Sequence, residues 1–373
     1  MKKIKVLHVI GGLNRGGAET MLMNLFKHVN HNKFEFHFLV YYSEKETQDY
    51  EKEVINLGGK IIHVSSNNML NMFFDTYNIC KKEKYDIVHA HTLFNSFISI
   101  LASRLCNTPM RITHSHSTGQ MKKENIIIKI YIKVSKLIIK KCSTHYFACG
   151  VQAGYYLFGK KLFDKKGLVF KNGIDLDVFN PQKKSDNNQN SKLIQVGCIG
   201  SFYRVKNHQF LIELAEWQKN NNINDIKYNL VGKGNLEEHI KEQIKEKKVE
   251  KYFKFYGTRN DINVVMNFID ILVMPSLYEG IPVTLIEAQA CGLPCIISNR
   301  ISTEVDLGLN LLTILDINKN YKEWNEFIHK KYLSFFKEKD KEYIEKVITQ
   351  SGYNIKDTAI KLERIYTDGI FKK

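Results

Sequence analysis

Short runs of apolar and mostly β-branched residues alternate with longer stretches of helical periodicity along the whole chain. This alternation is typical of parallel sheets whose strands are joined by helices. Seven such runs come before residue 180 and six come after it, so each set can build a doubly wound parallel sheet of its own. The predicted strands are KVLHVI, FEFHFLV, KIIHVS, DIVHAH, RITHSH, HYFACG and GLVFKNG in the first set, and LIQVGCIG, YNLVGKG, FKFYG, DILVMPS, PCIIS and LLTIL in the second.

The length also indicates two domains, because 373 residues exceed what one hydrophobic core usually fills. The segment PQKKSDNNQNSK, residues 181–192, is polar and has no hydrophobic periodicity, as expected of an interdomain linker. We therefore expect a first α/β domain over 1–180 and a second over 193–354. A closing helix is predicted over 355–373. One arrangement open to this helix is to cross back and pack on the first domain.

The composition is that of an ordinary globular protein, with 43% hydrophobic and 25% charged residues, so disordered and fibrous classes are excluded. The seven cysteines form no CxxC pair, which suits buried thiols in a reducing cytoplasm. The N-terminus, MKKIKVLHVIGG, imitates a signal peptide, but its apolar run is short and Asn14 and Arg15 soon follow it. No window offers the roughly 18 apolar residues of a spanning helix, so we expect no bilayer crossing.

Positive charge is concentrated in the first half of the chain. Residues 1–180 hold 26 Lys and Arg against 14 Asp and Glu, whereas the remainder holds 29 against 25. Much of the excess lies in residues 121–141, a predicted helix with apolar faces. Its lysines either meet the headgroups of an anionic membrane surface or are merely solvated above a core-facing helix, and the pattern does not separate the two. No recognised motif indicates nucleic acid. The lysines at helical spacing are Lys129, Lys133, Lys136 and Lys140.

The segment LYEGIPVTLIEAQACGLP, residues 277–294, contains two glutamates in an otherwise apolar run. Pro282 suits a first helical turn and Gly292 a C-cap, so a helix of about ten residues is predicted between them. Glu279 precedes this helix and Glu287 lies inside it.

A carboxylate at an apolar helical position is costly unless something hydrogen-bonds it. The two hydroxyls of a ribose are good partners for Glu287, while backbone amides at the helix start can face a phosphate or a sugar oxygen. The alternative is structural: Glu279 complements the helix dipole and Glu287 pairs with a lysine. The residues assigned to the helix start are Gly280, Ile281, Pro282 and Val283.

The segment resembles the E-x7-E signature of the glycosyltransferase family 4 type. The resemblance extends along nearly the full chain and is strongest to transferases of bacterial capsular and exopolysaccharide assembly. It implies a GT-B fold of two facing Rossmann-like domains with a cleft between them, and transfer of sugars from nucleotide donors with retention of configuration. The other similar segments are VLHVIGGLNRGGAETMLMNL, DIVHAH, RITHSH, HYFACG, KNGID, VKNHQFLIELA and VGKGNLEE.

Gly16 and Gly17 lie where the first strand turns into a helix, and their lack of side chains lets amides approach an anion. The spacing is not the GxGxxG of dinucleotide-binding proteins, which disfavours a dehydrogenase. The resemblance implies that this loop contacts the donor diphosphate or the transferred sugar. A tight structural turn is the alternative.

Arg204 and Lys206 follow the first strand of the second domain. Fixed cations there can stabilise the charge of a departing nucleoside diphosphate without a metal. Lys206 matches the lysine of the family, but Ser201 stands where the family usually has arginine. Either Arg204 reaches the same phosphates or the donor binds more weakly.

We predict no metal site. Asp175 and Asp177 form a DxD pair, but this pair overlaps the NGID segment, in which the resemblance makes Asn172 the residue nearer the sugar.

Two HxH pairs, His89 with His91 and His114 with His116, each project to one face of a strand because side chains alternate with a period of two. Four imidazoles are able to ligate zinc, but no carboxylate or thiolate completes a catalytic site. The resemblance instead assigns His116, and next His114, to the sugar as a hydrogen-bond donor or charge stabiliser. The remaining histidines receive no role: His8, His28, His31, His37, His63, His145, His208, His239 and His329.

The resulting hypothesis is a metal-independent, retaining glycosyltransferase without a cofactor. Its donor is expected to be a UDP-sugar, and its acceptor a saccharide or a polyprenyl-diphosphate-linked saccharide, used in the cytoplasm or at the inner membrane face. The catalytic candidates are His116, His114 and Glu279. The alternatives are a non-catalytic nucleotide-sugar-binding partner of a polysaccharide complex, for which Ser201 is the support, and a sugar-nucleotide epimerase of the same fold.

Overall fold

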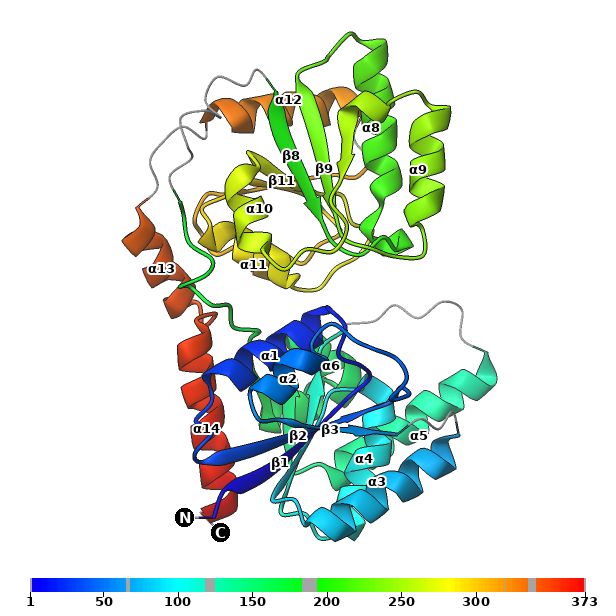
Figure 1. The fold of residues 1–373 in the computed structure, drawn as a ribbon, viewed down its shortest axis with the longest axis vertical. Helices are drawn as coiled ribbons and strands as arrows, with labels where there is room; N and C mark the ends of the chain where they lie inside the picture. Colours follow the sequence, from blue (N-terminus) through cyan, green and yellow to red (C-terminus); the bar gives the residue numbers. More distant parts are fainter. Residues whose placement is uncertain are drawn as a thin grey trace. The chain divides into compact units, whose positions relative to one another are not determined.

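The computed structural model describes residues 2–64, 68–117, 125–182, 193–318, 320–334 and 340–371. These residues form two compact units, Met1–Gly173 with Gly352–Lys373, and Ile174–Ser351 (Figure 1). The C-terminal helix therefore belongs to the first unit. The boundaries predicted from the sequence stay a prediction, and the expected linker lies outside the described residues except for residues 181 and 182.

The first unit contains a seven-stranded parallel sheet in the order β3-β2-β1-β4-β5-β6-β7. Its strands are β1 Ile4–Ile10, β2 Phe34–Val40, β3 Lys60–His63, β4 Ile87–Ala90, β5 Met110–Ser115, β6 His145–Ala148 and β7 Gly167–Val169. Its helices are α1 Gly17–His28, α2 Glu51–Asn56, α3 Met69–Glu83, α4 Ser96–Leu105, α5 Ile126–Cys142, α6 Val151–Phe158, α7 Lys160–Lys166 and α14 Ile355–Phe371, with a 3-10 turn η1 at Leu93–Asn95.

Alternate side chains of the central strands enter two different cores, one on each face of this sheet. Leu7 and Val9 of β1 pack with residues of α3 and α4. Val6 and Ile10 of the same strand pack with α1 and α14. Because both faces are covered, the strands are almost continuously apolar, as buried parallel strands generally are.

Helix α14 completes the second of these cores. Ile355, Leu362 and Tyr366 are buried at one stripe of the helix, and α14 lies alongside α1 (Figure 1). The carboxylate of Glu363 accepts a hydrogen bond of 2.7 Å from the backbone N–H of Asn30, just after α1. The C-terminal helix is thus an integral part of the first unit.

The second unit contains a six-stranded parallel sheet in the order β10-β9-β8-β11-β12-β13, which is the strand order of the classical dinucleotide-binding fold. Its strands are β8 Ile194–Ile199, β9 Ile226–Val231, β10 Phe253–Phe255, β11 Ile271–Met274, β12 Cys295–Ser298 and β13 Leu312–Leu315. Its helices are α8 His208–Asn220, α9 Glu237–Glu246, α10 Ile262–Phe268, α11 Val283–Ala290, α12 Tyr321–Ser334 and α13 Lys341–Gln350, with 3-10 turns η3 Arg204–Lys206, η4 Glu250–Tyr252 and η5 Thr303–Val305.

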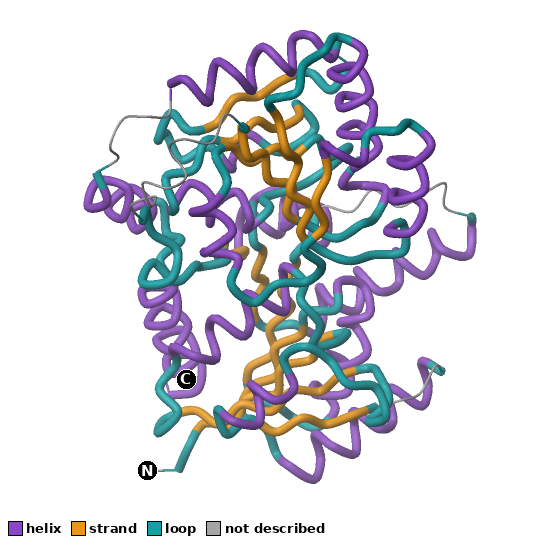
Figure 2. Tube along the Cα trace, turned by 45° about the horizontal axis from the view of Figure 1, so that its top comes forward, coloured by secondary structure: helices purple, strands orange, loops and turns teal. Residues whose placement is uncertain are grey.

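The core on one face of this second sheet is rich in aromatic residues. Trp324 of α12 is fully buried, and its ring lies 4.7 Å from that of Phe210 on α8. Figure 2 shows that, within each unit, the strands (orange) lie inside a layer of helices (purple).

Each of the thirteen predicted runs contains a strand, so the two Rossmann-like parallel sheets expected from the alternation are confirmed. None of the helices among the described residues combines the length and the apolar character that crossing a bilayer requires.

Candidate active site

The residues predicted to bind the donor in the second unit gather at the carboxyl edge of its sheet. Chain order reverses between β8 and β11, because β9 and β10 extend the sheet on one side and β12 and β13 on the other. Ligands of open parallel sheets bind outside the carboxyl ends of strands at such a switch point. Arg204 and Lys206 follow β8, and Glu279 follows β11, so these residues flank this point.

Lys206 and Glu279 form an ion pair across the two loops, with 2.5 Å between Nζ and Oε1. Their side chains are only 16% and 19% exposed, which weakens solvent screening. The sequence prediction placed both residues at the donor but did not foresee that they pair with each other.

Backbone contacts hold these loops in place. The backbone N–H of Leu277 donates to the carbonyl of Val205 at 2.8 Å, and the Asn207 side chain donates to the carbonyl of Pro275 at 3.0 Å. Glu279 forms a bridge with Ile301, so the residue is also tied to the loop after β12. The loops that carry Lys206 and Glu279 are therefore held by contacts among the segments that follow β8, β11 and β12.

Glu287 is buried within α11, at 8% exposure. Burial raises the pKa of this carboxyl from 4.5 to about 7. No lysine or arginine in the described part of the chain forms an ion pair with it, so the structural alternative of a Glu287–lysine pair has no support there. A buried carboxyl without a cation is costly and calls for another partner.

The N-terminus of α11 lies beside the same edge of the sheet. The helix has eight residues instead of about ten, and Pro282 is its extended N-cap rather than part of its first turn. Residues 280–284 are partly exposed, and the first amides of a helix have no intrahelical acceptor. Of the predicted group, Gly280, Ile281 and Val283 thus offer backbone N–H groups and partial positive charge to an anion, whereas Pro282 has no N–H to donate.

Arg204 is exposed, and Ser201 is partly exposed just after β8. Gly200 lies beneath the Lys206 side chain: a Cβ at Gly200 would lie 3.1 Å from Cε of Lys206. Gly232, after β9, has a φ of +143°, and a Cβ there would lie 2.0 Å from the carbonyl oxygen of Gly200. These two glycines let the ends of β8 and β9 approach closely under the lysine.

In the first unit, Gly16 and Gly17 begin α1 directly after the loop that follows β1. A Cβ at Gly16 would lie 2.3 Å from the carboxylate of Glu19, whose pKa burial raises. A Cβ at Gly17 would meet nothing within 4 Å, and Gly17 does not have a positive φ. No contact among the described residues requires glycine at position 17, whereas the close approach of a ligand would.

The two HxH pairs come together with a fifth histidine, His8 of β1, within the carboxyl-terminal halves of β1, β4 and β5 and just beyond β4 and β5. His114 is fully buried, and its ring centroid lies 4.0 Å from that of His116. His116 lies just beyond β5, and its Nε2 is 2.9 Å from Nδ1 of His91. Burial lowers the pKa of His116 to about 3, so this ring is neutral at physiological pH.

Sequence reasoning gave no role to His8, and it considered His91 only as part of an HxH pair. His8 lies opposite His89 in the β1–β4 register, and its Nδ1 is 3.1 Å from Nε2 of His91. The signal was present, because the usual strand order places the first strand beside the fourth, so that inward histidines of both strands share a face.

Asn172 lies after β7, is 9% exposed, and has an Oδ1 atom without a partner among the described residues. Its neighbour Gly173 packs closely against Ile355 of α14. By contrast, Asp175 accepts a hydrogen bond from the backbone N–H of Asp177 at 2.9 Å, which is the geometry of a turn. The DxD pair thus has a local structural explanation.

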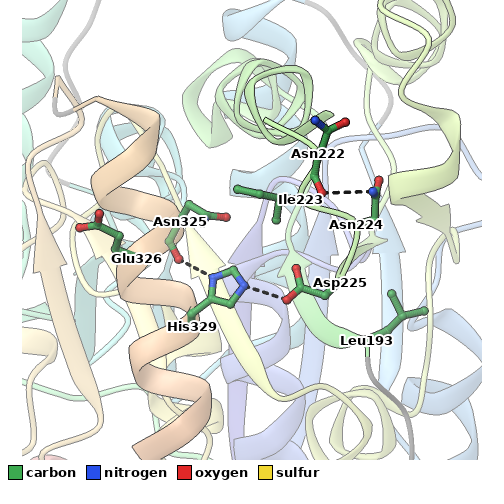
Figure 3. A pocket seen from close by; sticks show the side chains of 8 residues that line it. All are labelled: Leu193, Asn222, Ile223, Asn224, Asp225, Asn325, Glu326 and His329. Atoms are coloured by element: carbon green, nitrogen blue, oxygen red, sulfur yellow. Dashed lines mark hydrogen bonds and ion pairs between the residues drawn. The ribbon is translucent and has the colours of Figure 1, made fainter. Parts of the chain in front are cut away.

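A separate pocket of about 750 Å³ lies at the opposite, amino edge of the second sheet (Figure 3). His329 lies between the Asp225 carboxylate, at 3.0 Å, and the carbonyl of Asn325, at 2.8 Å. None of the predicted site residues lines this pocket. Its lining residues are Leu193, Asn222, Ile223, Asn224, Asp225, Asn325, Glu326 and His329.

Comparison with known proteins matches both halves of the chain to glycosyltransferase models. Residues 15–178 match the model described as Glycosyltransferase Family 4, and residues 179–310 match Glycosyl transferases group 1. Solved structures agree in fold. A glycosyltransferase from Rickettsia africae has a TM-score of 0.77 at 20% identity, with full coverage of both chains. Anabaena HepE in complex with UDP has a TM-score of 0.75 at 16% identity, covering 98% of this chain and 100% of that one.

Three relatives extend the comparison. EpsF of Bacillus subtilis (strain 168), named as a glycosyltransferase, is 36% identical over 97% of this chain and 96% of its own length. The capsular polysaccharide biosynthesis glycosyltransferase CapH of Staphylococcus aureus is 31% identical over 79% of this chain and 81% of its own. An Escherichia coli UDP-Gal:α-D-GlcNAc-diphosphoundecaprenol α-1,3-galactosyltransferase is 31% identical over 60% of both. With these matches and its two Rossmann-like sheets, the chain belongs to the GT-B glycosyltransferases of family 4.

Proposed function

We propose that this protein transfers a sugar from a UDP-sugar, with retention of configuration, to a saccharide acceptor in capsule or exopolysaccharide synthesis. The observation that carries the proposal is Glu287, a buried carboxyl without a cation, which lies on the helix that follows the Lys206–Glu279 pair. The UDP complex of Anabaena HepE and the UDP-Gal donor named for the E. coli relative support uracil as the base.

In this proposal each unit has a defined task. Glu287 accepts hydrogen bonds from the two ribose hydroxyls. Lys206, Arg204 and the backbone N–H groups of Gly280, Ile281 and Val283 bind the diphosphate, and Glu279 contacts the sugar. The first unit contributes the amides of Gly16 and Gly17 to the donor. Asn172, His114 and His116 supply the hydrogen bonds from the first unit to the sugar.

The transfer needs no protein nucleophile in this proposal. The acceptor hydroxyl attacks on the face from which the nucleoside diphosphate departs, its proton passes to the leaving phosphate, and Lys206 stabilises the charge left on that phosphate. This assignment requires neither a metal nor a cofactor, since the cation and the helix amides supply the positive charge.

Two experiments test the function. A thermal-shift screen with UDP-, GDP- and ADP-sugars should show stabilisation by UDP compounds, because a ligand that binds the folded state raises its apparent stability. Product analysis by NMR after transfer should then show the anomeric configuration of the donor. An inverted product contradicts the retaining assignment, and unchanged donor kinetics in Glu287→Ala contradict the ribose assignment.

We further propose that the acceptor is linked to polyprenyl diphosphate and is used at the inner face of the membrane. Two of the relatives are named for acceptors on diphosphoundecaprenol. Helix α5 buries Ser135, Ile139 and Cys142 on one face. Its other apolar stripe is exposed and is flanked by Lys129, Lys133 and Lys140; it consists of Ile126, Ile127, Ile130, Val134 and Leu137, at 69%, 72%, 57%, 48% and 52%. Such a stripe suits insertion at an anionic bilayer surface.

Liposome flotation tests this surface. The protein should float with vesicles that contain phosphatidylglycerol and float less with phosphatidylcholine alone. An Ile127→Ser/Ile130→Ser variant should lose flotation, whereas Leu333→Ser, at a side chain that is 73% exposed in the second unit, should not. If the protein floats with neither kind of vesicle, the membrane proposal is contradicted. That result does not bear on the transfer activity, which the two experiments above test separately.

A non-catalytic role in binding a nucleotide-sugar is the second candidate. Ser201 favours it, because the family usually has arginine at this position. Slow hydrolysis of the donor, or transfer to any acceptor, excludes this candidate.

A further inference from the structure

Three histidines of the first unit form a continuous hydrogen-bonded chain. Nδ1 of His8 lies 3.1 Å from Nε2 of His91, and Nδ1 of His91 lies 2.9 Å from Nε2 of His116. Paired rings are close to coplanar, with interplanar angles of 21° and 26°. The chain runs from the buried middle of β1, past the end of β4, to the end of β5.

Both ends of this chain are buried without a partner. Nε2 of His8 and Nδ1 of His116 have no hydrogen bond among the described residues. All three rings are neutral at physiological pH, because burial lowers the pKa of His8 and His116 to about 3 and that of His91 well below its usual value. Neutral imidazole carries one proton on one nitrogen, so each ring donates from one side and accepts on the other.

Each of the three neutral rings carries one N–H, and each of the two N···N hydrogen bonds requires a single donor. Only two sets of tautomers satisfy both bonds. In one, every ring is protonated at Nδ1, and His116 presents an N–H at the outer end. In the other, every ring is protonated at Nε2, and the free N–H belongs to His8, whose ring centroid lies 4.5 and 5.8 Å from those of Phe36 and Phe38. A buried N–H without an acceptor is rarer than a buried acceptor without a donor. Each arrangement leaves one N–H without an acceptor, and only the first places this N–H on His116, the residue that the proposed function assigns to the sugar.

We propose that His8 and His91 are positioning residues, which hold His116 as the Nδ1–H tautomer so that it donates one hydrogen bond to a hydroxyl of the donor sugar. This inference rests on the proposed function and adds to it the atom that acts and the two residues that set its proton. Fixing the tautomer in advance removes a reorganisation step when the sugar binds.

The same residues do not form a good metal site. The nitrogens of His8, His89 and His91 lie within 4.8 Å of one another, as do those of His91, His114 and His116. However, His89 and His91 stack at a centroid distance of 4.3 Å, and His114 and His116 lie 4.0 Å apart. Lone pairs in the planes of stacked rings do not converge on one ion, and His89 already bonds the Tyr366 hydroxyl at 2.7 Å.

NMR of the full chain, labelled with ¹⁵N-histidine, reads the tautomers directly through two-bond couplings. We expect His8, His91 and His116 to be Nδ1–H tautomers, assigned from His8→Gln, His91→Asn and His116→Gln, with His145→Gln as a control that leaves these signals unchanged. An Nε2–H tautomer at His116 overturns the proposal. One equivalent of tightly bound zinc or copper in protein purified without chelators also overturns it.

Two nearly isosteric variants test the effect on transfer. Asn at position 91 is able to donate to Nε2 of His116, whereas Asp only accepts and forces the Nε2–H form. We expect kcat to fall about tenfold further in His91→Asp than in His91→Asn, with a smaller difference in donor KM. Equal kcat values in folded variants overturn the positioning role. A wild type that is inactive with every donor, but whose spectra show three Nδ1–H rings, refutes the proposed function and supports the chain of tautomers.

Discussion

Replacing Glu287 by Gln should make the free protein more stable and nucleotide binding weaker. In the folded protein burial raises the pKa of Glu287 from 4.5 to about 7. The folded state therefore holds this proton more tightly than the unfolded state does. The stability that this difference contributes is fully present below pH 4.5 and is lost as the pH rises from 4.5 through 7.

The magnitude follows from the size of the shift. At 1.36 kcal/mol for each pKa unit, ionising Glu287 lowers the free energy of unfolding by about 3 kcal/mol above pH 8. Gln has nearly the same shape and never ionises. Glu287→Gln should thus be more stable than the wild type by up to about 3 kcal/mol at pH 8.5, and by no more than about 1 kcal/mol at pH 5.

Binding should change in the opposite direction. A carboxylate accepts charge-assisted bonds from two ribose hydroxyls, and a neutral amide oxygen replaces them poorly. One charged hydrogen bond contributes about 1.5–3 kcal/mol, so we expect the Kd for UDP to rise roughly tenfold to a hundredfold. In the wild type this affinity should increase with pH through 7, because the ionised carboxyl is the form that binds the diol.

Urea denaturation at pH 5 and 8.5 measures the first effect, and calorimetric titration with UDP at the same pH values measures the second. A structural carboxylate predicts a less stable variant with an unchanged Kd. That pair of results refutes the assignment of Glu287 to the ribose. If the variant gains the same stability at both pH values, the gain does not come from ionisation of Glu287. That result leaves the assignment of Glu287 to the ribose untouched.

Three further predictions concern the surrounding site. Gly17→Ala should keep or slightly raise the melting temperature, since its Cβ meets nothing within 4 Å, yet it should weaken UDP-sugar binding; a lower melting temperature with unchanged binding contradicts the assigned approach of the donor. Glu279→Gln should strengthen UDP binding severalfold by releasing Lys206, and lower kcat, whereas Lys206→Ala should weaken UDP binding at least tenfold; calorimetry and turnover assays distinguish these outcomes. Ser201→Arg should strengthen UDP binding by about tenfold in the same titration, and no change there argues that Arg204 already supplies the charge.

The strands were predictable because local patterns fix them. Every apolar run yields a strand, since a parallel strand covered on both faces has little choice of residue. Helix ends were less predictable. Pro282 is compatible with the N-cap as well as with the first turn, and α11 proved two residues or so shorter than expected.

The unusual environment of Glu287 was predictable, because the segment that contains this residue also contains the apolar neighbours that surround it. Glu287 is unusual within its own helix, and its lack of a cation follows from the apolar residues around it. The partners of the other residues depend on contacts between distant segments. Lys206 and Glu279 are 73 positions apart, and their pairing depends on β8 and β11 being neighbours in the sheet. The contact between His8 and His91 depends in the same way on the β1–β4 register.

The two glutamates of residues 277–294 differ because their surroundings differ. Glu279 lies in a loop tied to β12 and faces a cation from the neighbouring strand, which compensates its charge before any substrate arrives. Glu287 lies in α11, the helix that follows Glu279, among apolar side chains. Because its pKa is about 7, both the protonated and the ionised form of its carboxyl are populated near neutral pH. A diphosphate would compete with Glu279 for Lys206, whereas a ribose would stabilise the charged form of Glu287. Donor binding should therefore be coupled to the opening of one ion pair and, near pH 7, to the release of the fraction of a proton that Glu287 still holds.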